Sequence, residues 1–206
     1  MPLQPPQIEK KPYKVNDYDH LIGSTRFSKE LLETHLKLYG QYVTHTNKVL
    51  ELLHGDELDE YAAREVERRF VWEFNGMRLH ELYFDGMNGT GGRPEQDTVV
   101  MDAIEQGFGS FDKWEKAFRS LGKTRGIGWA ALVHDPKSDR LLHLWINEHD
   151  AGPLAETNTV LIMDMFEHAF IRDFGTDRGK YMDAFFDAVD WDKAEKRLRE
   201  GRKRNP

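Results

Sequence analysis

Three histidines and one aspartate stand in apolar stretches of this sequence, where a polar side chain without partners is costly to bury. Asp164 and His168 lie four residues apart in the segment MDMFEHAF, directly after an apolar run that indicates a strand. His35 and His80 each lie on the apolar face of a helical pattern. Taken singly, such a histidine is more often a hydrogen-bonded core residue than a ligand. Three imidazoles and one carboxylate taken together favour a site for iron, manganese or zinc.

The composition limits the other kinds of site. The 206 residues include no cysteine, which excludes disulfides, iron–sulfur clusters, zinc ribbons and cysteine nucleophiles. The formal net charge of −7 argues against general nucleic-acid binding, and we expect the basic segment 196–204 to be a solvated, frayed end. No window reaches transmembrane length, and residues 1–14 lack the apolar core of a signal peptide. We therefore expect a cytoplasmic protein that binds neither nucleic acid nor membrane.

The other histidines have surroundings that give weaker signals. His20, His54 and His134 stand in polar or turn contexts, which predicts surface positions. His45 and His143 are ambiguous. Their neighbours favour a surface or a hydrogen-bonded core position over a functional one.

The elements that must position the four residues begin with a predicted helical hairpin. We expect residues 1–26 to form an extended arm with turns, and Ser28 to cap a helix that continues to Leu53. A second helical run covers about 59–86. The glycine- and proline-rich segment 85–96 predicts a loop, which is the natural boundary between two units.

After this loop the pattern changes from helices to strands and back. A short helix is predicted over about 97–107, and another follows it. Residues 126–147 predict two strands around the turn DPKSDR, and about 158–164 a third, before helices close the chain. This order predicts an α+β fold, in which an N-terminal long-helix hairpin is followed by an α/β unit with a three-stranded antiparallel sheet. We assign the arm and hairpin to a domain over 1–90 and the α/β unit to a domain over 91–206.

Several segments, in order along the chain, resemble the iron/manganese superoxide dismutase family. Residues 164–170 match the pattern D-x-x-E-H-A-[YF] and resemble the family's C-terminal metal signature. FSKELLETH (27–35) and NGMRLHELYF (75–84) resemble the segments around its first two ligands. FGSFDKWEKAF, GIGWAALV and AVDW resemble further family segments, so the likeness covers about residues 27–193.

The resemblance implies a function and four metal ligands. The family holds one iron or manganese ion per subunit with three histidines, one aspartate and a solvent molecule, which implies His35, His80, Asp164 and His168 as ligands here. The implied reaction converts superoxide, a small anion, to oxygen and hydrogen peroxide. The net positive charge left at such a centre attracts an anion. Iron and manganese share these ligands, so the sequence does not choose between them.

Two further residues are implied near the metal. Tyr42 matches the family's active-site tyrosine if one residue is deleted after His35, and the alternative is a core aromatic residue. The family usually places a glutamine near the solvent ligand, either on the second helix, where this chain has Gly76, or after the second strand, in the segment NEHD (147–150). We hypothesise that His149 takes this role, because histidine donates the same hydrogen bond but can also titrate. The alternative is a surface loop histidine.

The resemblance also implies a homodimer, in which Glu167 bridges to His168 of the partner subunit. The substrate entrance differs from the family pattern. Ile171 stands where a tyrosine from the neighbouring subunit is expected, and Leu38 or Tyr39 stands where an entrance histidine is expected.

Two alternatives to a dismutase stay open at this point. One is a structural or binding protein of the same fold without activity, but such a protein should lose ligands, whereas this chain keeps all four. The other is a different mononuclear metalloenzyme, such as a non-haem iron oxygenase or a zinc hydrolase. An oxygenase usually offers two histidines and one carboxylate and leaves more positions open.

Overall fold

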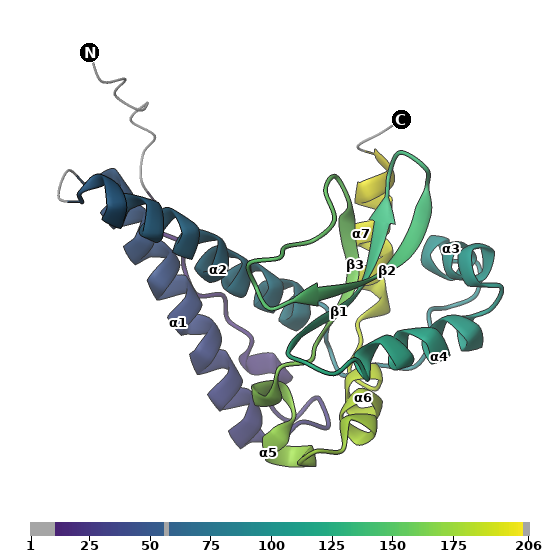
Figure 1. The fold of residues 1–206 in the computed structure, drawn as a ribbon. Helices are drawn as coiled ribbons and strands as arrows, with labels where there is room; N and C mark the ends of the chain where they lie inside the picture. Colours follow the sequence, from purple (N-terminus) through teal and green to yellow (C-terminus); the bar gives the residue numbers. More distant parts are fainter. Residues whose placement is uncertain (1–10, 56–57, 204–206) are drawn as a thin grey trace.

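The computed structural model describes residues 11–55 and 58–203. The fold begins with two long helices that lie side by side as a hairpin (Figure 1), α1 (Lys29–His54) and α2 (Glu60–Asp85). Ser28 caps α1, because its hydroxyl oxygen accepts a hydrogen bond from a backbone N–H of the first turn at 3.1 Å. Asp59 caps α2 in the same way at 2.8 Å. The predicted helical hairpin is therefore confirmed, while the first ten residues of the predicted arm lie outside the described residues.

A three-stranded antiparallel sheet forms the second half of the fold. Its strands are β1 (Gly128–Asp135), β2 (Arg140–Asn147) and β3 (Asn158–Asp164). The order is β2-β1-β3. The two strands predicted over 126–147 pair with each other, and β1 also pairs with β3. The register places Trp129 of β1 opposite Asp164, the last residue of β3. The prediction of an α+β fold with this sheet is confirmed.

Shorter helices surround the sheet. They are α3 (Val99–Phe108), α4 (Phe111–Gly122), α5 (Ile171–Phe174), α6 (Arg178–Phe186), α7 (Trp191–Lys203), and the 3₁₀ helices η1 (Asp19–Leu21) and η2 (Glu167–Ala169). In Figure 1, α7 passes behind the sheet and packs against β3, whereas α3 and α4 lie on the side away from the long hairpin. The division into domains over 1–90 and 91–206 stays a prediction.

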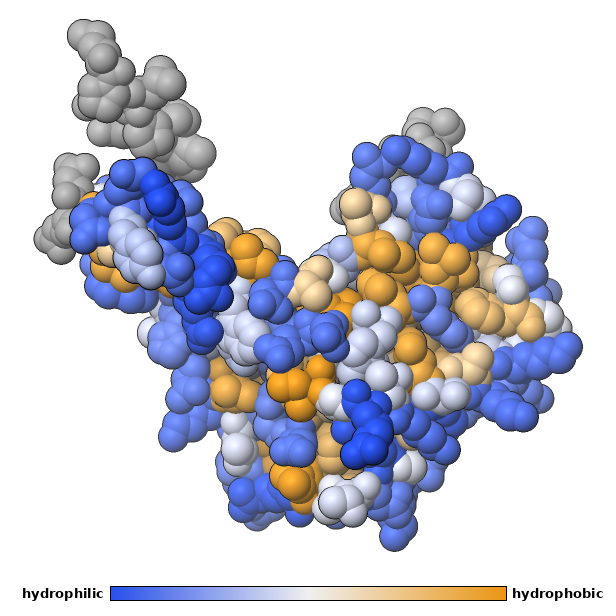
Figure 2. Space-filling model, viewed as in Figure 1, coloured by the Kyte–Doolittle hydropathy of each residue, from blue (hydrophilic) through white to orange (hydrophobic). Residues whose placement is uncertain are grey.

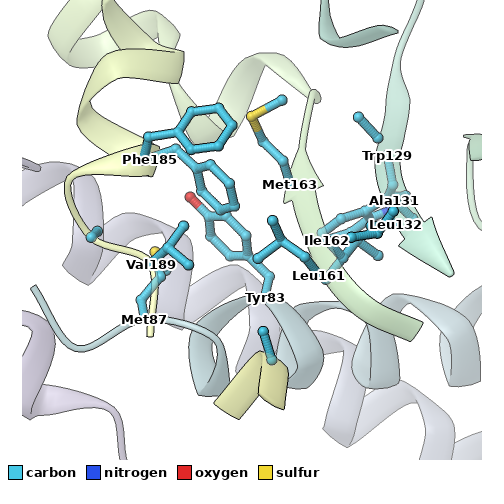
Figure 3. Close-up of a cluster of buried hydrophobic side chains, with 14 of the residues drawn as sticks. Tyr83, Met87, Trp129, Ala131, Leu132, Leu161, Ile162, Met163, Phe185 and Val189 are labelled. Carbon is cyan, nitrogen blue, oxygen red and sulfur yellow. The ribbon is translucent and has the colours of Figure 1, made fainter. Parts of the chain in front are cut away.

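One apolar core joins the long hairpin to the sheet (Figure 3). Tyr83 of α2 packs face to face on Phe185 of α6, with ring centroids 5.9 Å apart and planes 6° apart. Trp129 of β1 and Ile162 of β3 are also fully buried in this core. Because α2 and β3 are packed into one core, the side chains they carry are held at fixed positions relative to each other.

The basic segment near the C-terminus is not frayed. Helix α7 continues through Lys203, and its residues Ala194 and Leu198 are buried. The guanidinium of Arg197 donates hydrogen bonds to the backbone carbonyls of Leu82 at 2.8 Å and Val160 at 3.4 Å. The expectation of a solvated end over 196–203 is therefore wrong, because a helix with charged residues can still bury one face. Residue 204 lies outside the described residues.

The prediction of a surface position is also wrong for His134, whereas His20 and His54 are exposed. His134 is buried near the end of β1, with Nε2 2.9 Å from a carboxylate oxygen of Asp139. Gly201 of α7 lies directly against the ring, since a Cβ at that glycine would be 2.9 Å from Nδ1. Polar neighbours in sequence thus misled the prediction, because a helix far along the chain covers this residue.

Apolar residues gather over the part of the molecule that holds the sheet, and some line the recess between it and the arm of α1 and α2 (Figure 2). Most of the remaining visible surface is hydrophilic. Within residues 11–55 and 58–203, no helix has the length and apolar character needed to cross a membrane.

Candidate metal centre

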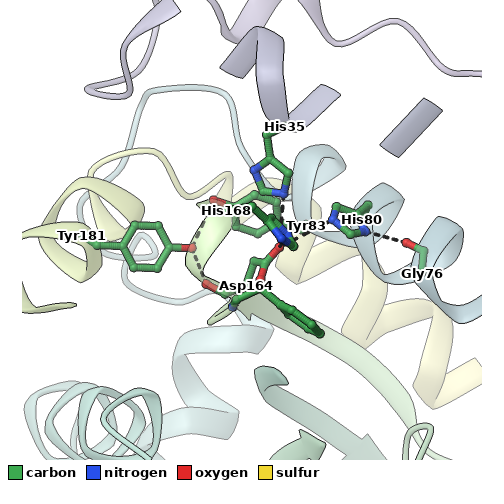
Figure 4. A network of polar contacts seen from close by, with 8 residues as sticks. His35, Gly76, His80, Tyr83, Asp164, His168 and Tyr181 are labelled. Atoms are coloured by element: carbon green, nitrogen blue, oxygen red, sulfur yellow. Dashed lines mark hydrogen bonds and ion pairs between the residues drawn. The ribbon is translucent and has the colours of Figure 1, made fainter. Parts of the chain in front are cut away.

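Three histidine rings point at one carboxylate oxygen of Asp164 (Figure 4). The Nε2 atoms of His35 and His168 lie 3.2 and 3.1 Å from Asp164 Oδ2. The Nε2 atom of His80 lies 3.6 Å from the same oxygen. One donor atom from each of the four residues lies within 4.8 Å of the others. The structure thus brings together the four residues that the sequence singled out.

Four separate elements supply these side chains. His35 comes from α1, His80 from α2, Asp164 from the end of β3 and His168 from η2. The strand ends at Asp164 because its Oδ1 accepts a hydrogen bond from the backbone N–H of Phe166 at 2.8 Å, which turns the chain. This turn places the imidazole of His168 back over the carboxylate.

The spacing of the donor atoms fits a shared metal ion. Donor atoms about 2.1 Å from one ion are ~3.0 Å apart at a right angle and ~3.6 Å apart at 120°. The distances from Asp164 Oδ2 to the three Nε2 atoms fall in that interval, from 3.1 to 3.6 Å. Among the described residues, the buried Nε2 of His80 has no hydrogen-bond partner. A bound cation would satisfy this lone pair.

Burial and mutual contacts set the charges of the cluster. Burial lowers the pKa of His35 and, together with the neighbouring His35 ring, holds the pKa of His80 well below its ordinary value. Burial acts to raise the pKa of Asp164, but the facing rings of His168 and His35 outweigh it and lower that pKa. An ionised carboxylate therefore faces neutral imidazoles at His35 and His80, a donor set suited to iron or manganese.

A second layer of hydrogen bonds orients these donors. The Nδ1–H of His80 donates to the backbone carbonyl of Gly76 at 2.5 Å, which directs the Nε2 lone pair toward Asp164. The hydroxyl of Tyr181 donates to the backbone carbonyl of Asp164 at 2.5 Å, and it lies 3.2 Å from the hydroxyl of Tyr83. Figure 4 shows this chain of contacts running from α6 to the centre.

The comparison with known proteins agrees with this geometry. A family model described as iron/manganese superoxide dismutases, C-terminal domain, matches residues 96–197. A manganese superoxide dismutase of Haloarcula marismortui is 33% identical over 92% of this chain and 91% of its own length. An iron superoxide dismutase of Sulfolobus acidocaldarius is 32% identical over 93% and 92%. One of Cupriavidus metallidurans, also iron, is 35% identical over 84% and 89%. The chain belongs to the iron/manganese superoxide dismutase family.

Tyr42 is the tyrosine of α1 that faces this dismutase centre. Its ring lies 5.2 Å from the ring of His80 and 5.0 Å from that of His149. Burial, assisted by the charge of Asp164, raises the pKa of Tyr42 to about 12. Tyr39 is turned to other partners, because its hydroxyl donates to Glu81 Oε1 at 3.0 Å.

His149 lies inside the molecule, so the alternative of a surface loop histidine is wrong. Its ring is enclosed by aromatic side chains at centroid distances of 4.9 to 5.9 Å, which belong to Tyr42, Trp72, Trp129 and Phe166. It also lies 5.9 Å from the ring of His80. Within the described residues, neither ring nitrogen of His149 has a hydrogen-bond partner. Burial lowers the pKa of His149 to about 4.

Gly76 marks a place on α2 where no longer side chain fits beside the centre. A Cβ built at Gly76 would lie 2.5 Å from a ring carbon of Tyr42. The tyrosine ring therefore fills the space that a longer side chain at position 76 would need. The imidazole of His149, from the connection after β2, packs edge-on against that ring.

Three contributing residues were not anticipated from the sequence. Tyr181 supports Asp164, Trp72 packs on His149 at 5.1 Å, and Asn75 donates a hydrogen bond to the backbone carbonyl of His149 at 2.7 Å. Helical spacing was a usable signal for Trp72, which stands two turns before His80 and so shares its face of α2.

We predict that Gly76→Ala disturbs the centre, because the new methyl group must displace the ring of Tyr42. The expected cost is about 1–3 kcal/mol of unfolding free energy, measured by urea denaturation, together with a lower metal content. Gly40→Ala is the matched control, since a Cβ there meets only a side-chain carbon of Val15 at 3.8 Å. Equal stability and metal content in the two variants would contradict the packing argument.

Proposed function

We propose that this chain is a superoxide dismutase that uses one iron or manganese ion per subunit. Membership of the family and relatives named as iron or manganese superoxide dismutases support the reaction. The observation that carries the proposal for this chain is the convergence of three Nε2 atoms on Asp164 Oδ2. We assign His35, His80, Asp164 and His168 as the metal ligands.

The reaction takes two superoxide ions and two protons to one oxygen molecule and one hydrogen peroxide. One superoxide loses an electron and the other gains one, and the peroxide takes both protons. Iron or manganese, when bound, would accept the electron from the first superoxide and return it to the second. The side chains of the protein hold the ion, leave an approach for a small anion and supply hydrogen bonds.

Tyr42 and His149 are proposed to supply those hydrogen bonds. With a pKa of about 12, the hydroxyl of Tyr42 keeps its proton near neutral pH and can donate it in a hydrogen bond. With a pKa of about 4, His149 is neutral there and offers one N–H donor. The lack of any partner for its nitrogens within the described chain supports a role toward a group bound at the centre.

The function is tested by removing all metal and loading iron and manganese separately. We expect one ion per chain and dismutase activity, assayed with superoxide from pulse radiolysis, in at least one loaded form. Asp164→Asn removes the central charge and should lower metal content and activity at least about tenfold. His143→Ala is the control, because this histidine packs on Phe108, away from the four ligands. Full metal occupancy without activity in both forms would reject the proposed function.

For His149 we expect the type of substitution to matter. His149→Ala should lower kcat about 10- to 100-fold, as the loss of an outer hydrogen bond at a metal site typically does. His149→Gln keeps an N–H donor and should retain most of the activity. Metal content should be similar in both variants. If the two variants were equally active, a hydrogen-bonding role for His149 would be wrong.

We also propose the homodimer, with Glu167 of one subunit accepting a hydrogen bond from His168 of the partner subunit. Glu167 is exposed, and its carboxylate makes no hydrogen bond or ion pair within the described chain. The side chain of His168 is 24% exposed, unlike the fully buried side chains of His35 and His80. Ile171 nearby is half exposed and offers an apolar contact. The cytoplasmic location stays a prediction from the sequence.

Sedimentation equilibrium checks this assembly. The unaltered chain should sediment at twice its mass of 24.1 kDa, and Glu167→Gln should weaken the dimer and lower the metal affinity at least about tenfold. Glu105→Gln makes the same charge change on the exposed surface of α3 and should have no effect. A monomeric unaltered chain at micromolar concentration would refute the dimer.

A further inference from the structure

We propose that Arg69 guides the anionic substrate toward the metal centre, and that Glu73 and Trp72 hold it in place for this role. The inference rests on the proposed dismutase function, because the substrate of that reaction is a small anion. Arg69 lies on α2, three turns before His80. Neither the motifs in the sequence nor the ligand set of the centre pointed to this residue.

Glu73 is the unusual feature of this part of α2. Its side chain is only 4% exposed, although it carries a carboxylate. The Nε–H of Arg69 donates to Glu73 Oε1 at 2.7 Å, and Nδ1 of His45 lies 3.6 Å from Oε2. The side chains of Arg69 and His45 are 54% and 59% exposed. A buried negative charge is thus covered by cationic or titratable groups on its solvent side.

The indole of Trp72 connects Arg69 to the centre. The guanidinium carbon of Arg69 lies 5.2 Å from the centroid of the Trp72 ring, within the range of a cation–π contact. The same indole makes an edge contact with the ring of His149, at a centroid distance of 5.1 Å. Arg69, Trp72 and His149 therefore form a continuous chain of contacts from the surface to the residue that lies beside the candidate metal ligands.

The charges of Arg69 and Glu73 also reach Tyr42. Burial and then Asp164 are the main causes that raise the pKa of Tyr42. Glu73 raises this pKa further, and Arg69 opposes it. The two groups therefore act on the same small region, which is the half-buried edge of the centre.

An anion that approaches this edge is repelled by the carboxylate of Glu73 and attracted by the guanidinium of Arg69. The whole chain has a formal net charge of −7, and the carboxylate of Glu73 is buried next to Arg69. Arg69 neutralises that carboxylate and, being more exposed, presents its positive charge to the solvent. Loss of Arg69 would remove the attraction and also uncover the repulsion from Glu73.

Arg68 offers a matched comparison, because it is the adjacent residue with the same charge. Its side chain is 73% exposed and pairs with Glu65, a partner three residues before it on α2. It has no cation–π contact with Trp72. Arg68→Gln and Arg69→Gln therefore change the net charge equally but differ in their relation to the centre.

The first experiment measures kcat/KM for superoxide against ionic strength in the metal-loaded enzyme. Arg69→Gln should lower kcat/KM about three- to tenfold at low salt and flatten its salt dependence, with kcat and metal content unchanged. Arg68→Gln should change it by less than about 1.5-fold. Arg69→Lys keeps the charge and should retain at least about half of kcat/KM.

Substitution of Glu73 separates guidance from a purely structural role. Glu73→Gln should raise kcat/KM about twofold, and the double variant with Arg69→Gln should return to within about twofold of the unaltered enzyme. A structural pair would instead give lower activity in Glu73→Gln as well. That result, or equal effects of Arg69→Gln and Arg68→Gln, would overturn the inference while the activity of the unaltered enzyme still supports the proposed function.

A second readout does not depend on metal or activity. In a Trp145→Phe background, Trp72 is the tryptophan most open to solvent, since Trp114, Trp129 and Trp191 are buried. Arg69→Gln should lower the quenching of its fluorescence by iodide about twofold or more and leave quenching by neutral acrylamide unchanged. If iodide quenching does not fall, Arg69 provides no local attraction for anions and the inference is wrong. An inactive but iodide-sensitive protein would reject the proposed function alone.

Discussion

The geometry of the candidate metal centre depends on one buried carboxylate, that of Asp164 at the end of β3. A carboxylate with no exposed surface is costly unless a cation or strong donors face it. Here the groups that face it are imidazoles, and burial keeps His35 and His80 from carrying the compensating charge. A bound metal ion would supply that compensating charge. The shared core of α2, β1, β3 and α6 keeps the donors in place.

The ring of Tyr42 limits which side chains can reach this centre. The ring of Tyr42 touches the backbone of α2 at Gly76, so no side chain can extend from that position. The connection after β2 is the next element that reaches the centre, and His149 comes from it. An imidazole is rigid and flat, so the aromatic residues around it fix its position by packing. Glycine at position 76 and histidine at position 149 therefore both pack against the same ring, that of Tyr42.

Sequence patterns predicted the parts of the fold and of the site that depend on neighbouring residues in the chain. The long helices, the strands and the apolar stripes carrying His35 and His80 follow from periodicity and caps, and family resemblance joined them into one candidate site. Burial imposed by distant elements was not predictable in this way. His134 is covered by α7, and the half-buried Arg197 donates hydrogen bonds to carbonyls of α2 and β3, although both have polar neighbours in sequence. The role of Trp72 was not predictable from its neighbours, because its partner His149 lies 77 residues further along the chain.

For an anion near the centre, the positions of individual charged groups matter more than the net charge of the chain. A protein with a formal net charge of −7 repels a small anion at long range, but at physiological salt this repulsion is screened beyond about 8 Å. Asp164, Glu73 and Arg69 are the charged groups that act on Tyr42, at the half-buried edge of the site. A bound ion would offset the carboxylate of Asp164, and Arg69 pairs with that of Glu73. With a metal bound, each of these two carboxylates would face its own cation, which would allow an anionic substrate to approach an acidic protein.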